Sequence, residues 1–266
     1  MNLNGVRQMA ALLLRFRNGP ELVRCLRAGR PCDELVLWDG TRLAHPPNRA
    51  GLLEAVQEIW LQRDYTGGFY RPADGDVIVD AGANIGLFSI LMARQNRRCR
   101  VVALEPFAEN FNFLQANVAA AAVENVTCCE TALGASVGKG RMQALGGRSL
   151  DHVLQAEAPR SNGGETNPAG DIPVVPLSGL FDLAHAPQID FLKVDIEGSE
   201  RDVFAAATPE ALGRIQRVAM EYHDNLVPGT LELLCRVFGP THDVAVHPSS
   251  MAGCGMLHAR RRDVES

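Results

Sequence analysis

The sequence has 266 residues, of which 46% are hydrophobic and 21% are charged, and its formal net charge at pH 7 is −5. These proportions are typical of a folded globular protein, and they exclude a disordered tail, a fibrous repeat and a transmembrane bundle. Because 31 acidic residues outnumber 26 lysines and arginines, the chain lacks the basic excess of nucleic-acid-binding proteins, and we expect no nucleic-acid partner.

The cysteines and the first apolar run indicate the cellular compartment of the protein. The seven cysteines are odd in number and contain no Cys-x-x-Cys pair, which indicates free thiols in a reducing compartment. The apolar run at residues 9–14 is too short for a membrane span, which takes about 20 apolar residues, and it lacks a signal-peptide cleavage pattern. We therefore expect a cytoplasmic protein with no membrane partner.

The first seventy residues are predicted to form a small cap. Hydrophobic periodicity and turn signals indicate two short helices, a hairpin around Asp39-Gly40 and a third helix, within residues 6–28, 34–44 and 52–62. We expect residues 1–70 to be a helical and hairpin cap that serves as the surface of a homodimer or as a lid.

From residue 71 onward, strand and helix patterns alternate, which predicts an α/β domain over residues 71–266 with a mostly parallel sheet. The last two strand patterns, on either side of residues 248–250, are expected to pair as an antiparallel hairpin at the edge of the sheet. Residues 155–172 contain almost no large apolar side chain, and they predict a long polar loop that is either a surface insertion or a lid.

The first strand of this domain leads into the turn Asp80-Ala-Gly82-Ala-Asn84-Ile-Gly86. Its glycines permit positive φ and let a ligand approach the backbone, and the helix that follows begins with unpaired N–H groups. The spacing is neither the G-x-G-x-x-G of dinucleotide-binding enzymes nor a P-loop. A carboxylate at Asp80 would repel a diphosphate and would suit a cationic ligand such as the ammonium group of an amino acid.

A second acidic residue, Glu105, ends the next predicted strand and precedes Pro106. In a βαβ unit, an acidic residue at this place can accept hydrogen bonds from both ribose hydroxyls. An ammonium-binding end and a ribose-binding end together fit S-adenosylmethionine. An NAD(P)-dependent oxidoreductase stays open as an alternative, since it would also explain the βαβ unit and Glu105.

These motifs, with Asn110 and Asn117, Ala132-Leu-Gly134 and the run Ile189-Asp-Phe-Leu-Lys-Val-Asp195-Ile-Glu-Gly-Ser-Glu200, resemble the FkbM-type S-adenosylmethionine-dependent methyltransferases over residues 75–225. The resemblance implies a Rossmann-like class I methyltransferase with a seven-stranded, mostly parallel sheet that ends in an antiparallel strand. It also implies O-methylation of a hydroxyl on a small molecule, a sugar or a secondary metabolite, as in natural product biosynthesis. An inactive S-adenosylmethionine-binding partner protein is a further alternative.

By the same resemblance, the turn after the first strand holds the methionine part of the cofactor, Glu105 holds the ribose, and the following segments border the adenosine. The implied cofactor-binding residues are Asp80, Gly82, Ala83, Asn84, Gly86, Glu105, Pro106, Phe107, Asn110, Thr131, Ala132 and Asp195.

The reacting end is predicted from two other strand tips, because ligands of open α/β sheets bind beyond the carboxyl ends of the strands. Asp195 and Glu197 follow one strand, and Glu221 and His223 lie at the end of another. A hydroxyl acceptor must lose its proton, and His223 or Asp195 could take it as a general base. Alternatively, Asp195, Glu197 and Glu221 could hold Mg²⁺, which would lower the pKa of the hydroxyl.

Overall fold

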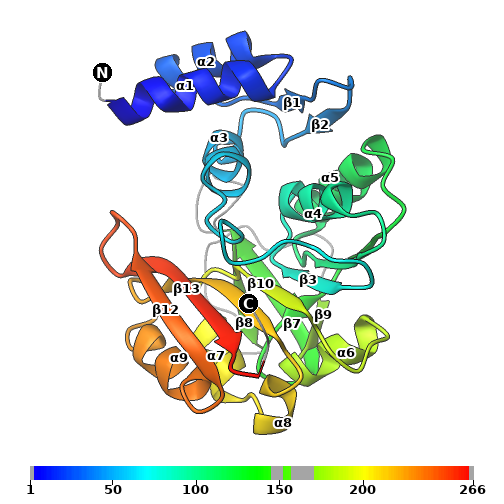
Figure 1. The fold of residues 1–266 in the computed structure, drawn as a ribbon, viewed down its shortest axis with the longest axis vertical. Coiled ribbons are helices and arrows are strands. Elements are labelled where there is room, and N and C mark those ends of the chain that lie inside the picture. The colour runs from blue at the N-terminus through cyan, green and yellow to red at the C-terminus, as the bar shows by residue number, and fades with distance from the viewer. Residues whose placement is uncertain (1–2, 145–151, 157–170, 264–266) are drawn as a thin grey trace.

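The computed structural model describes residues 3–144, 152–156 and 171–263, and its centre is a seven-stranded sheet (Figure 1). The strands lie in the order β12-β13-β11-β10-β3-β4-β5. In chain order they are β3 (Val77–Ala81), β4 (Arg100–Leu104), β5 (Val126–Cys129), β10 (Phe191–Val194), β11 (Arg217–His223), β12 (His242–Pro248) and β13 (Cys254–Arg261).

The five strands from β11 to β5 are parallel, and only β13 reverses direction between its neighbours β11 and β12. Parallel strands covered on both faces are almost continuously apolar, and every residue of β3 and β10 is buried. The predicted mostly parallel sheet and the antiparallel hairpin at its edge, β12–β13, are confirmed. Ile189 and Ile215 form an isolated parallel bridge ahead of β10 and β11.

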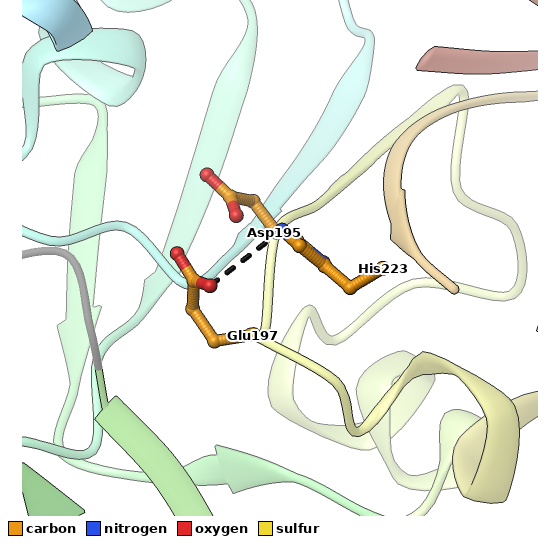
Figure 2. Close-up of side chains that lie close together, drawn as sticks. All are labelled: Asp195, Glu197 and His223. Carbon is orange, nitrogen blue, oxygen red and sulfur yellow. Dashed lines mark ion pairs between the residues drawn. The ribbon is translucent and has the colours of Figure 1, made fainter. Parts of the chain in front are cut away.

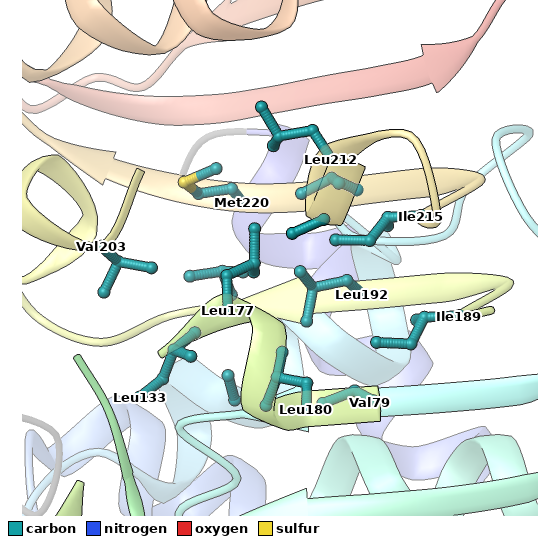
Figure 3. Close-up of a cluster of buried hydrophobic side chains, with 14 of the residues drawn as sticks. Val79, Leu133, Leu177, Leu180, Ile189, Leu192, Val203, Leu212, Ile215 and Met220 are labelled. Atoms are coloured by element: carbon teal, nitrogen blue, oxygen red, sulfur yellow. The ribbon is translucent and has the colours of Figure 1, made fainter. Parts of the chain in front are cut away.

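Side chains alternate between the two faces of the sheet, and each face has its own apolar core. Val79, Leu192 and Met220 pack on one face beneath the later helices (Figure 3). Ile78 and Phe191 pack on the opposite face. The first face is covered by η2 (Leu177–Gly179), α6 (Leu180–Leu183), α7 (Glu200–Ala205), α8 (Pro209–Leu212) and α9 (Thr230–Phe238), and the opposite face by α4 (Leu87–Gln95) and α5 (Ala108–Ala120).

The N-terminal segment contains the predicted helices and hairpin, at the top of Figure 1. Its elements are α1 (Leu3–Arg15), α2 (Gly19–Ala28), β1 (Glu34–Val36), β2 (Arg42–Ala44), α3 (Leu52–Ala55) and the π-helix η1 (Val56–Gln62). Its apolar side chains Leu12, Phe16 and Leu22 belong to the same buried cluster as Phe88 and Phe191. The segment therefore shares a core with the sheet, while its description as a separate cap stays a prediction.

A second, smaller sheet was not predicted. It has four strands in the order β6-β9-β7-β8, which are β6 (Ala132–Leu133), β7 (Gly138–Ala144), β8 (His152–Ala156) and β9 (Ile172–Val175). These strands are short, and Gly138, Gly140 and Pro173 interrupt their apolar pattern, so periodicity alone does not mark them. Residues 155–156 and 172 of the predicted polar loop lie in strands, and its central part, with the predicted lid, lies outside the described residues.

Within the part of the chain that the structure describes, every helix is too short or too polar to cross a membrane.

Asn117 of α5 joins the N-terminal segment to the sheet domain. It is 1% exposed, its Nδ2 donates to the carbonyl oxygens of Ala44 and Ile85, and its Oδ1 accepts from the Ala44 N–H. We expect Asn117→Ala to lower the free energy of unfolding by about 3 kcal/mol, because it leaves buried backbone groups unpaired. Urea unfolding would measure the loss. Gln115→Ala, an exposed position on the same helix, should change stability by less than about 0.5 kcal/mol, and equal effects would contradict this role.

Candidate functional site

One cavity lies at the carboxyl ends of β3, β4 and β10, where the N-terminal segment passes over them. The residues that line this cavity come from the sheet domain and from the N-terminal segment. They include Gly82, Ala83, Asn84, Glu105, Pro106, Asn110, Thr131, Ala132, Lys193, Asp195 and Glu197 from the sheet domain, and His45, Leu52, Glu58, Ile59 and Tyr65 from the N-terminal segment. The cavity thus spans the predicted cofactor and reacting ends.

The turn after β3 brings two strand ends into contact. Gly82 has φ 77°, and a Cβ on it would lie 1.7 Å from the carbonyl oxygen of Asp195. Asn84, with φ 50°, adopts the left-handed region that few non-glycine residues adopt. The turn thus exposes backbone to the cavity, and only glycine fits at position 82.

Glu105 sits at the end of β4 with 5% of its surface exposed. Its Oε2 accepts from the Asn84 N–H at 2.8 Å and its Oε1 accepts from the Phe107 N–H at 2.9 Å. Burial raises its pKa to about 7, against the lowering effect of these two hydrogen bonds. A carboxylate has about four acceptor positions, so Glu105 can accept further hydrogen bonds from a ligand in the cavity.

Lys193 is the charged group at the centre of the site. Its Nζ donates to the carbonyl oxygen of Gly82 at 2.7 Å and lies 3.3 Å from Oδ1 of Asp80 and 3.5 Å from Oδ2 of Asp195. Burial lowers its pKa, but the two carboxylates outweigh burial and raise it above the usual lysine value. Lys193 therefore stays charged inside the protein.

Asp80 is placed differently from the prediction. It is 0% exposed, accepts a hydrogen bond from the Ser89 hydroxyl at 2.7 Å and pairs with Lys193. It is not among the residues that line the cavity. In the structure Asp80 thus forms an internal ion pair, its direct contact with a cationic ligand stays a prediction, and Asp195, the other carboxylate beside Lys193, does line the cavity.

Asp195, Glu197 and His223 converge beside the cavity (Figure 2). One candidate ligand atom from each lies within 4.8 Å of the others. The Nε2 of His223 is 3.5 Å from Oε2 of Glu197 and 3.9 Å from Oε1 of Glu221. Its Nδ1 is 3.2 Å from Oε1 of Glu200, which is itself fully buried. The group of candidate ligands that meets this distance contains His223 in place of Glu221, and the predicted trio Asp195, Glu197 and Glu221 stays a prediction.

The carboxylates around His223 change its predicted chemistry. Burial alone would lower the pKa of His223, but the hydrogen bond and charge of Glu200 and the charge of Glu197 raise it to about 10. Burial, with the charge of Asp195, raises the pKa of Glu197 to about 9. These carboxylates favour the protonated imidazole, whereas a general base must be neutral, so the role of His223 as the base stays a prediction.

Most predicted cofactor residues line the cavity, and the others lie behind its wall. Gly86 has φ 89° at the start of α4 and packs under Leu114. Phe107 is buried against Ala132, Ile172 and Val174. The predicted cofactor-binding residues that line the cavity are Gly82, Ala83, Asn84, Glu105, Pro106, Asn110, Thr131, Ala132 and Asp195, and those that do not are Asp80, Gly86 and Phe107. Glu197 also lines it, whereas Glu221 and His223 do not.

Several residues that line the cavity were not predicted from the sequence, and they include two ionisable residues of the N-terminal segment. Glu58 lies in the π-helix η1 and Tyr65 follows it. Burial raises the pKa of Glu58 to about 8, with further contributions from the charges of Glu221 and Asp195. π-helical turns are frequent at functional sites, but the sequence pattern predicts an ordinary helix over residues 52–62 and contains no signal of the π-helix.

The sheet order, with its single reversed strand β13, and the cavity beyond the carboxyl ends of the strands define a Rossmann-like methyltransferase fold. A model of the "Methyltransferase FkbM domain" matches residues 80–236. The chain therefore belongs to the FkbM methyltransferase family.

Three relatives of known name match different shares of the chain. The "31-O-demethyl-FK506 methyltransferase FkbM" of Streptomyces tacrolimicus is 30% identical over 72% of this chain and 82% of its own length. The "Methyltransferase sdnD" of Sordaria araneosa is 32% identical over 54% of this chain and 65% of its own length, just under two thirds. The "Hexuronic acid methyltransferase AglP" of Haloferax volcanii is 26% identical over 66% of this chain and 71% of its own length.

Solved structures resemble the chain more distantly. A putative methyltransferase from Streptococcus mutans in complex with SAH aligns with a TM-score of 0.46 at 9% identity, over 76% of this chain and 97% of that one.

Two glycine variants separate the effect of the close contact between Gly82 and the Asp195 carbonyl from the effect of the positive φ at Gly82. We expect Gly75→Ala, at φ 85° with nothing within 4 Å of the added Cβ, to cost about 1–2 kcal/mol in the free energy of unfolding. Gly82→Ala should cost ~3 kcal/mol more, because its Cβ overlaps the Asp195 carbonyl. Urea unfolding of both variants measures the difference. Equal losses would show that the strand ends are not in this contact.

Proposed function

We propose that this protein is an S-adenosylmethionine-dependent methyltransferase that transfers a methyl group to a hydroxyl of a small molecule. The observation that carries the proposal is the pairing of a buried carboxylate, Glu105, with the exposed backbone of residues 82–84 in one cavity of an FkbM-family chain. When bound, the cofactor supplies an electrophilic methyl group on a sulfonium.

The adenosine half of the cofactor fits the β4 and β5 end of the cavity. Glu105 already accepts two backbone hydrogen bonds that fix its orientation, which leaves its other acceptor positions for the ribose hydroxyls. Thr131 and Ala132 line the adjoining wall and would border the adenine. The backbone of Gly82 and the carboxylate of Asp195 would hold the methionine half, the carboxylate facing its positive charges.

The acceptor half of the cavity is lined by the N-terminal segment. Two relatives are, by their printed names, methyltransferases of 31-O-demethyl-FK506 and of a hexuronic acid. The first name supports an oxygen acceptor on a secondary metabolite, and the second supports a sugar acceptor. A role in natural product biosynthesis, a cytoplasmic location and a homodimer all stay predictions. Most of the acceleration would come from aligning the hydroxyl with the methyl group.

The proton of the hydroxyl can leave by either of two routes. Asp195 lines the cavity and His223 does not, and the carboxylates around His223 favour its protonated form, so Asp195 is the better placed base. Alternatively, Asp195, Glu197 and His223 would hold Mg²⁺, which lowers the pKa of a bound hydroxyl. The donor set, two carboxylates and one imidazole, fits a divalent cation. Glu200 lies at Nδ1 of His223 and would hold the imidazole ring in its orientation.

Two other functions have less support. An NAD(P)-dependent oxidoreductase would share Glu105, but the family to which the chain belongs is one of methyltransferases. An inactive S-adenosylmethionine-binding partner protein would show damage among the polar groups of the reacting end, whereas Asp195, Glu197 and His223 lie together. Release of S-adenosylhomocysteine in the presence of an acceptor hydroxyl would distinguish an enzyme from a binder.

We expect Glu105→Gln to weaken binding of S-adenosylhomocysteine at least tenfold, as measured by isothermal titration calorimetry, because two charge-assisted ribose hydrogen bonds are lost. Glu109→Gln is the matched control. This carboxylate lies four residues further on, is 39% exposed and pairs with Arg49, so its removal should leave affinity unchanged. Undiminished affinity in the Glu105 variant would refute the ribose assignment.

The metal route is tested with Mn²⁺, whose free form is counted by electron paramagnetic resonance. We expect the protein to bind one Mn²⁺ and Glu197→Gln to weaken that binding about 10–100-fold. Glu210→Gln, at an exposed position of α8, serves as the control and should bind as the unmodified protein does. Failure of the unmodified protein to bind Mn²⁺ at millimolar concentration would leave Asp195 as the base.

A further inference from the structure

The matched family domain begins at residue 80, yet a side chain from before that point reaches into the site. We propose that Tyr65 is a positioning residue, which holds the Asp195 carboxylate so that its free oxygen faces the positive charge of S-adenosylmethionine. This inference rests on the proposed function, because it takes the cavity as the site of that cofactor.

The contact is direct and buried. Tyr65 is 2% exposed, and its hydroxyl donates to Oδ2 of Asp195 at 3.1 Å. The Nζ of Lys193 lies 3.5 Å from the same oxygen and 5.3 Å from the centre of the Tyr65 ring. Oδ2 of Asp195 therefore interacts with two groups of the protein, the Tyr65 hydroxyl and the Lys193 ammonium group.

The other oxygen of the carboxylate has no such partner. Oδ1 of Asp195 is buried and makes no hydrogen bond within the described part of the chain, and Asp195 lines the cavity. A buried carboxylate oxygen without a hydrogen bond is costly. A cationic ligand in the cavity would remove that cost, provided that the carboxylate does not rotate to bring both oxygens onto Lys193. The Tyr65 hydroxyl is the group that opposes this rotation.

Tyr65 is itself held firmly. The π-helix ends at Arg63 with φ 60°, and the N–H groups of Thr66 and Gly67 donate to the Arg63 carbonyl. The carbonyl of the intervening Asp64 lies 2.9 Å from Nε2 of His258 on β13. The Tyr65 ring also packs edge-on against Phe88, with ring centres 5.9 Å apart. The backbone and the ring are thus anchored to the sheet domain on two sides.

The two forms of the cofactor separate positioning from simple packing. S-adenosylmethionine carries a sulfonium, whereas S-adenosylhomocysteine lacks the transferred methyl group and with it the sulfonium charge, and both keep the ammonium group. Loss of general packing would weaken both ligands alike. Loss of a carboxylate aimed at the positive charge would weaken S-adenosylmethionine much more than S-adenosylhomocysteine.

The test compares Tyr65→Phe with Tyr70→Phe, both measured by titration calorimetry with each ligand. Tyr70 is a matched control, because its hydroxyl also donates to an aspartate, Asp76, at 2.6 Å, but neither residue lines the cavity. We expect Tyr65→Phe to weaken S-adenosylmethionine about fivefold, the value of one hydrogen bond, and S-adenosylhomocysteine less than about twofold. Tyr70→Phe should leave both affinities unchanged. Tyr65→Met, which fills the space without a hydroxyl, should repeat the result if the phenylalanine variant folds poorly.

A double-mutant cycle then asks whether Tyr65 acts through Asp195. In the Asp195→Asn background, Tyr65→Phe should have no further effect on affinity for S-adenosylmethionine. If Asp195→Asn weakens binding while Tyr65→Phe matches Tyr70→Phe, the inference is overturned and the proposed function stands. If the unmodified protein binds neither ligand, the proposed function itself fails.

Discussion

The ion pairs of Lys193 are the interaction on which the rest of the site depends. A buried lysine is tolerated only where opposite charges and hydrogen bonds replace water, and here Asp80, Asp195 and the Gly82 carbonyl do so. These three partners come from the ends of β3 and β10. Because Lys193 binds all of them, the two strand ends are held together where Gly82 meets the Asp195 carbonyl, and the cavity opens above that contact.

The same arrangement leaves the site with more acidic than basic groups. Asp80 and Asp195 surround Lys193, and three further carboxylates, Glu197, Glu200 and Glu221, lie around one imidazole, His223. Glu58 is close enough to Glu221 and Asp195 for their charges to act on it. Burial and mutual repulsion raise the pKa of Glu58, Glu197 and Glu221 to about 8, 9 and 7. These groups therefore hold protons more tightly than exposed carboxyl groups do. A sulfonium or a divalent cation would displace those protons, so a site of this charge favours cationic ligands.

The sequence predicts those parts of the site that depend on short patterns of neighbouring residues. The glycine turn, Glu105 and the strand-tip acids Asp195 and Glu197 each follow a recognisable strand, and the structure brings them to one cavity. The role of Asp80 depends on a register that no local pattern contains, since it lies directly across from Lys193 on the neighbouring strand. The high pKa of His223 likewise depends on Glu200, whose carboxylate turns back to it from the start of α7.

The contribution of the N-terminal segment is harder to predict for a further physical reason. Tyr65 and Asp195 are separated by 130 residues, and the contact exists only because the segment shares the apolar core beneath Phe88 and Phe191. Apolar patterning shows that the segment packs somewhere, but not on which face of the sheet. Once it packs on the face that carries Lys193, its π-helix and the turn after it meet the polar ends of the strands. The segment then has two roles in one position, because it buries the core and also forms one wall of the cavity.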